Sequence, residues 1–149
     1  MIDIVLNNRT KSRAFERAFF VRVIEATKSF LKIPNGHTAE VGVTLVDAQA
    51  MQKLNSERRG INTPTDVLSF PLHMEPIKGY TSVLLGDLFI CPEVVRAKAI
   101  QEDRGQRARM AWTIVHGMLH LVGYDHEGST NEANRMFEAE RTILSALNL

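Results

Sequence analysis

Residues 106–126, QRARMAWTIVHGMLHLVGYDH, decide how the rest of the chain is interpreted. Over Gln106–Val122 the apolar residues cover more than half of the circumference of a helix, and a helix of that kind is mostly buried. These apolar residues are Met110, Ala111, Ile114, Val115, Met118, Leu119 and Val122. The narrow polar strip that remains carries Arg109, Thr113, His116, Gly117 and His120. Because unsatisfied polar atoms are costly inside a protein, we expect this strip to face a cleft.

Three histidines in this stretch have the spacing of metal ligands. His116 and His120 are four residues apart and project side by side from a helix. Gly123 can end the helix, because glycine adopts the left-handed conformation, and the turn then returns His126 to the same point. Three imidazoles leave a fourth tetrahedral position open, which is the arrangement of catalytic zinc. The sequence therefore predicts one zinc ion (Zn2+) per chain, bound by all three histidines.

Two other interpretations of the histidines are weaker. Ordinary surface or hydrogen-bonded histidines would not require three of the chain's five to fall at ligand spacing. A structural zinc site usually fills all four positions and uses cysteine, and the chain has a single cysteine, Cys91. Cys91 could complete such a site, but a lone cysteine at a strand end is more typical of an inert buried thiol. We therefore expect a catalytic metal site.

The spacing of the three histidines resembles the zinc motif of metzincin proteases, His-Glu-x-x-His-x-x-Gly-x-x-His. Gly117 occupies the position of the glutamate, which is the general base in those proteases. Peptide hydrolysis would then need another base, or a metal ion that lowers the pKa of water enough by itself. From its place on the polar strip, we expect Gly117 to leave space above the metal.

The rest of the chain alternates between short strands and amphipathic helices. Strands are predicted at Ile2–Leu6, Val41–Leu45, Val67–Phe70 and Leu84–Ile90. Helices are predicted from Ser12 to Phe30, after a cap at Asp47, over Pro92–Glu102 and Gln106–Val122, and after a capping box at Ser129–Glu132. Loops are predicted over Asn55–Asp66 and His73–Ser82.

This order of elements predicts an α+β (mixed α/β) fold. We expect one compact domain over residues 1–149, in which a sheet of about four strands is packed by about five helices. The metal site is expected at the end of a long buried helix.

Composition limits the cellular setting more than the activity. The 149 residues include 18 basic and 17 acidic side chains, so the net charge of +1 does not indicate any class of partner. One cysteine excludes an internal disulfide and favours a reducing compartment. The N-terminal residues lack a signal-peptide run, and no apolar stretch approaches the ~20 residues of a membrane span. The sequence predicts a cytoplasmic protein without a membrane partner.

Several blocks of this sequence resemble the YbeY family of endoribonucleases. They are the histidine stretch His116–His126, Leu54-Asn55 followed by Arg59-Gly60, the run Pro64–Pro71, and Gly86-Asp87 before Ile90. The blocks occur in order across most of the chain, which makes the match specific. The resemblance implies a zinc-dependent, single-strand-specific endoribonuclease that acts in 16S rRNA 3′-end maturation and ribosome quality control. It also implies single-stranded rRNA in ribosomal particles as the substrate, and ribosomal proteins or GTPases as protein partners.

The resemblance assigns Arg59 as the catalytic arginine, which also binds the substrate. A guanidinium can hold a phosphate through two donors and stabilise the charge that develops on it. Arg58 and Arg109 are expected to add to a basic approach for the RNA backbone. Asp125, beside His126, has two interpretations: it orients an imidazole from behind, or it caps the turn.

Two functions besides an endoribonuclease are consistent with these residues. One is a metallopeptidase-like hydrolase that has recruited another base, against which Gly117 argues. The other is a non-catalytic, zinc-containing ribosome-associated factor, against which the open three-histidine site argues. Metal analysis and cleavage assays on RNA and peptides distinguish the three.

Overall fold

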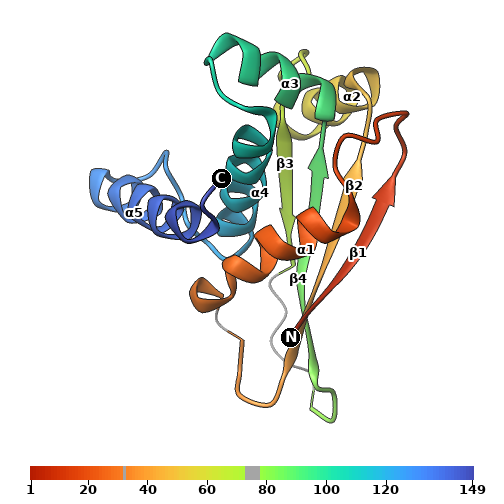
Figure 1. Ribbon diagram of the computed structural model, residues 1–149. Helices are drawn as coiled ribbons and strands as arrows, with labels where there is room; N and C mark the ends of the chain where they lie inside the picture. Colours follow the sequence, from red (N-terminus) through yellow and green to blue (C-terminus); the bar gives the residue numbers. More distant parts are fainter. Residues whose placement is uncertain (32, 73–77) are drawn as a thin grey trace.

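A mixed four-stranded sheet forms the centre of the computed structural model, which describes residues 1–31, 33–72 and 78–149. The strands are β1 (Ile2–Asn8), β2 (Thr38–Leu45), β3 (Val67–Pro71) and β4 (Ser82–Ile90). They lie in the order β1-β2-β4-β3, with β1, β2 and β4 parallel and β3 antiparallel to β4 (Figure 1). All the predicted strands are confirmed, and each is slightly longer than predicted. Of the loop predicted over 73–82, residues 73–77 lie outside the described residues, and its end belongs to β4.

Helices cover both faces of this sheet, which confirms the predicted α+β class. They are α1 (Arg17–Ala26), α2 (Ala48–Arg59), α3 (Pro92–Gln101), α4 (Gln106–Leu121) and α5 (Thr130–Leu147), with a 3-10 turn η1 (Lys28–Phe30) after α1. α1, α3, α4 and α5 add side chains to the main core on one face, and α2 packs on the other face around Met51, Leu68 and Cys91. Within the described ranges, no helix combines the length and the apolar character that a membrane crossing requires.

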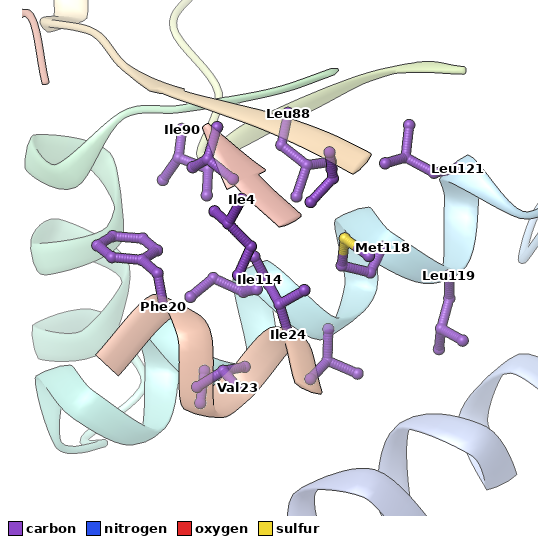
Figure 2. Close-up of a cluster of buried hydrophobic side chains, with 14 of the residues drawn as sticks. Ile4, Phe20, Val23, Ile24, Leu88, Ile90, Ile114, Met118, Leu119 and Leu121 are labelled. Atoms are coloured by element: carbon purple, nitrogen blue, oxygen red, sulfur yellow. The ribbon is translucent and has the colours of Figure 1, made fainter. Parts of the chain in front are cut away.

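Helix α4 is buried along most of its length, as its sequence predicts. Ile114 and Met118 have no exposed surface, and they meet Ile4 and Leu88 of the sheet in the main core (Figure 2). Each such side chain contributes about 1.5–3 kcal/mol when it leaves water on folding. The position of α4 on the sheet is therefore fixed by burial along its middle, and its C-terminal turns are held in place as a result.

The first helix is shorter than predicted. It begins at Arg17 rather than Ser12, because the side chain of Asn8 organises the residues after β1 as a loop. Asn8 Oδ1 accepts hydrogen bonds from the backbone N–H and the hydroxyl of Thr10 (2.9 and 2.7 Å), and Asn8 Nδ2 donates to Ser12 O (2.9 Å). Short polar side chains compete with helical hydrogen bonds in this way. The end of the predicted helix is also different, since it forms the turn η1.

Helix α2 is longer than predicted, which changes the location of Arg58 and Arg59. The sequence predicted a loop from Asn55, but α2 continues to Arg59 and ends at Gly60, whose φ is +72°. Asn55 is buried within the helix, and its Nδ2 donates to Thr63 O (2.8 Å). Asn55 was predicted to begin a loop, but it lies within α2 and holds the loop that follows the helix. Both arginines project from the last turn of a helix, which is a more rigid support than a loop.

Gly117 faces the sheet and not the space above the metal ligands, so its predicted position was wrong. A Cβ at Gly117 would lie 3.0 Å from a methyl group of Leu88 and 3.1 Å from a methyl group of Val67. The Gly117 carbonyl accepts a hydrogen bond from Ser69 Oγ (3.0 Å). A helical wheel gives the direction of a side chain but not the distance to neighbouring strands, which is why it misplaced this residue. Glycine permits the close approach of α4 to β3 and β4.

We predict that Gly117→Glu destabilises the fold by about 2 kcal/mol or more, because the added side chain meets the packed strands. Gly117→Ala is the matched control, since its gain of up to about 1 kcal/mol in helix propensity offsets the crowding of a single methyl group. Thermal unfolding of the metal-free proteins measures both effects. If Gly117→Glu unfolds at the wild-type temperature, its side chain reaches open space and the sequence-based placement is right.

Candidate metal centre

The three predicted ligands come together at the C-terminal end of α4. Ring nitrogens of His116, His120 and His126 all lie within 4.8 Å of one another. The chain reverses at Gly123, whose φ is +98°, and Tyr124 N donates to Leu119 O (3.0 Å) across the reversal. This turn carries His126 back toward the last two turns of α4. The structure thus places all three predicted metal ligands around one point.

Hydrogen bonds behind two of the imidazoles determine which nitrogens face that point. His116 Nδ1 lies 2.9 Å from Glu140 Oε1, and His120 Nδ1 lies 2.9 Å from the carbonyl oxygen of Tyr124. A carboxylate and a carbonyl can only accept, so each Nδ1 carries the proton and donates it. Each Nε2 is then left with its lone pair directed at the shared point.

The distance between these lone pairs fits a bound metal ion. His116 Nε2 and His120 Nε2 lie 3.1 Å apart. In neutral imidazoles whose Nδ1 atoms hold the protons, neither Nε2 has a proton to donate to the other. Two imidazoles on one tetrahedral ion, at ~2.0–2.1 Å each, would place their nitrogens roughly 3.3 Å apart. A cation also relieves the repulsion of two facing lone pairs. The donor set and its geometry therefore fit a divalent metal ion.

The electrostatic environment favours the metal-binding form of His120. Burial lowers the pKa of His120 below its ordinary value, and the neighbouring imidazoles of His116 and His126 lower it further. The neutral imidazole is the form that binds a metal. His126 is 38% exposed, so it lies at the open side of the group.

A cleft of about 440 Å³ opens in front of the histidines. The three imidazoles and Trp112 line it together with β3, and Arg58 and Arg59 line it from the end of α2. The guanidinium of Arg58 lies over the ring of Phe70, 4.6 Å from its centroid. The structure thus brings Arg58 and Arg59 to the same cleft as the predicted metal ligands, although the arginines and the histidines come from segments far apart in the sequence.

A larger pocket, of about 670 Å³, lies elsewhere, between the loop after β1 and the start of α3. Its described lining residues include basic side chains such as Arg9 and Arg96 but no histidine. Size alone does not mark a reactive site, and the smaller cleft is the one that contains convergent metal ligands.

Comparison with known proteins identifies the family. The family model described as Endoribonuclease YbeY matches residues 5–148. The chain belongs to the YbeY endoribonuclease family. Relatives named Endoribonuclease YbeY include those of Sulfurihydrogenibium sp. (35% identical over 97% of this chain and 91% of the relative), Persephonella marina (34%, 96% and 91%) and Halorhodospira halophila (40%, 77% and 75%). A solution structure of a Thermotoga maritima protein is also similar, with a TM-score of 0.63 and 29% identity over 97% of this chain and 87% of that chain.

The resemblance predicted from the YbeY motif blocks is thereby confirmed, and with it an enzyme of the endoribonuclease class. Of the other predicted site residues, Arg109 lies differently from expectation, whereas Asp125 matches one of its two interpretations. Arg109 is only 4% exposed and forms an ion pair with Asp66 (Nη2 to Oδ2, 3.1 Å), so it is not on the surface that RNA would meet. Asp125 Oδ1 accepts a hydrogen bond from Glu127 N (2.8 Å), which matches the alternative in which Asp125 stabilises the turn.

The carboxylate behind the YbeY histidines is Glu140, which the sequence analysis did not single out. Glu140 lies on α5 and is only 5% exposed. A signal was available, because Glu140 interrupts the apolar face formed by Met136, Ile143 and Leu147 at helical spacing. A charged residue on the buried face of an amphipathic helix requires a partner, and here one partner is His116, a predicted metal ligand.

We predict that the wild-type chain binds one divalent ion, and that His116→Ala, His120→Ala and His126→Ala each weaken binding strongly. Loss of a ligand should exceed the roughly 10–100-fold effect that loss of a group behind a ligand produces. Metal content after dialysis and titration with zinc measure this. His37→Ala, which removes a histidine outside the cleft, should retain the full metal content. Wild-type metal content in a variant lacking all three ligands would disprove the assignment.

Proposed function

We propose that this chain is a zinc-dependent endoribonuclease that cleaves single-stranded RNA. The observation that carries the proposal is the cleft whose lining combines three imidazoles with Arg58 and Arg59. A phosphodiester needs a group that stabilises its developing negative charge and a group that positions it, and the two arginines and the metal ligands lie where both can act. Membership of the YbeY endoribonuclease family supports the same chemistry.

Each wall of the cleft has its own task in this proposal. His116, His120 and His126 would hold the zinc ion, which would supply Lewis acidity at the phosphate or at the attacking oxygen, whether that oxygen belongs to water or to a ribose 2′-hydroxyl. Arg59 would grip a non-bridging phosphate oxygen pair through its planar donor fork. Arg58 would contribute charge to the approach of the RNA backbone, with its guanidinium held over the ring of Phe70.

The lining of the cleft supports a single strand as the substrate. It is formed by β3, the end of α2 and the histidine turn together, so the substrate backbone must enter between these elements to reach the histidines. A flexible strand can turn its backbone into such a cleft, whereas the paired strands of a duplex are constrained by stacking. We place this activity in the maturation of the 16S rRNA 3′ end and in ribosome quality control, in the cytoplasm, with ribosomal proteins or a GTPase as partners.

The two competing functions fit these residues less well. A peptidase of the metzincin kind uses a glutamate at the position of Gly117, and that position faces β3 and β4 here. A non-catalytic zinc factor would not need two arginines that line the cleft beside the predicted ligands. An assay that offers the metal-loaded chain both RNA and peptide substrates separates the three functions.

We predict that Arg59→Ala lowers the rate of RNA cleavage by about 100- to 1,000-fold, which is the usual effect of removing one charge-stabilising donor. Arg59→Lys should recover little, because a point charge cannot reproduce the bidentate fork. Cleavage of a labelled single strand and of the same sequence as a duplex gives the measurement, and the metal content should stay at the wild-type level.

Arg141→Ala is the matched control, since Arg141 is exposed on α5 and pairs with Glu138 outside the cleft. The proposed role of Arg59 is contradicted if Arg59→Ala and Arg141→Ala cleave at the same rate. Equal cleavage of the duplex and the single strand by the wild-type chain would contradict the proposed substrate class.

A further inference from the structure

The only tryptophan of the chain lies between a buried arginine and a predicted metal ligand. The ring of Trp112 stacks on the imidazole of His116, with centroids 4.5 Å apart and planes inclined by 21°. The guanidinium carbon of Arg109 lies 4.4 Å from the Trp112 ring centroid. Both contacts are made through the ring system, so Trp112 is a poor platform for stacking an RNA base. Its position instead determines where the His116 ring can lie.

Glu140 contacts the same two residues from the side. Its Oε1 accepts from His116 Nδ1 (2.9 Å), and its Oε2 accepts from Trp112 Nε1 (2.9 Å). The single carboxylate of Glu140 therefore ties the edge of the indole to the edge of the imidazole. Two contacts hold His116. Its ring stacks on Trp112, and its Nδ1 donates to Glu140, which is itself held by the hydrogen bond from Trp112.

The arginine under Trp112 is itself immobilised. Arg109 Nη1 donates to Thr113 Oγ1 (2.6 Å), and its Nη2 pairs with Asp66 (3.1 Å). Its Nε lies 3.2 Å from a Glu102 oxygen, without the alignment of a hydrogen bond. These contacts join α4 to the residue that precedes β3. Arg109, which begins the stack of Arg109, Trp112 and His116, is therefore held in place by its contacts with Asp66 and Thr113.

We propose that Trp112 and Glu140 are positioning residues that together set the orientation of His116 toward the metal ion. Neither residue binds the ion, and each acts through His116. This inference rests on the proposal that His116 is a metal ligand, but it does not depend on what the metal-loaded chain cleaves. The shared contact makes the two residues one unit, so their effects on metal affinity are not independent.

The chemistry of the site requires a carboxylate at position 140. Both neighbours, the indole N–H and the imidazole N–H, are donors, so position 140 must offer two acceptors. An amide has one acceptor oxygen, and its NH2 group would face one of the two N–H groups. Glu140→Gln is therefore expected to keep one contact and lose the other, with little change in shape.

The test is a double-mutant cycle on zinc affinity, measured by competition with a chromogenic chelator in the absence of RNA. We expect Glu140→Gln and Trp112→Phe each to weaken zinc binding by roughly 10-fold, within the range for groups behind a ligand. The loss of zinc affinity in the double variant should be much smaller than the product of the two single losses, because either change alone breaks the shared contact. Glu138→Gln, on the exposed side of α5, is the matched control and should bind zinc as the wild type does.

Two further measurements separate positioning from general destabilisation. Thermal unfolding of the metal-free variants shows whether the fold is retained, and zinc-induced change in Trp112 fluorescence should persist in Glu138→Gln but shrink in Glu140→Gln. Wild-type zinc affinity in Glu140→Gln, or strictly multiplicative effects in the double variant, would overturn the inference. If zinc affinity falls as expected while the wild type fails to cleave RNA, the proposed function fails and the positioning role stands.

Discussion

The burial of α4 against the sheet is the constraint on which the rest of the structure depends. Apolar side chains such as Ile114 and Met118 occupy the core, and the bare backbone at Gly117 lets the helix lie close against β3 and β4. The helix cannot rotate without exposing that surface or crowding those strands. The predicted metal ligands His116 and His120 lie on the side of α4 that remains only partly buried. The packing of α4 on the sheet thus sets the positions of His116 and His120.

The histidine trio could be predicted from the sequence because its geometry is local. A spacing of four residues on a helix, followed by a glycine turn, nearly determines where three imidazoles lie, whatever the remaining fold is. Glu140 could not be placed in the same way. Its contact with His116 depends on how α5 packs across α4, and that packing is set by side chains spread over both helices. Nonlocal contacts of this kind are not encoded in any short motif.

The errors in the sequence-based prediction have a common physical origin. Asn55 was interpreted as the start of a loop and Gly117 as a gap above the metal, because each was judged by its own character. In the structure each is explained by a partner instead: a carbonyl of the following loop for Asn55, and the methyl groups of two strands for Gly117. The prediction that Arg109 contributes to the approach of RNA fails for the same reason, since its acidic partners Asp66 and Glu102 come from other segments.

The position of the carboxylate on α5 links the docking of that helix to the state of the histidine centre. Glu140 accepts hydrogen bonds from His116 and Trp112, both on α4, so these two bonds exist only while α5 is packed against α4. A ligand that binds only the packed form of a protein stabilises that form by mass action. An ion held by a correctly oriented His116 would therefore oppose the local opening of α5, and loss of the ion would make that opening more frequent.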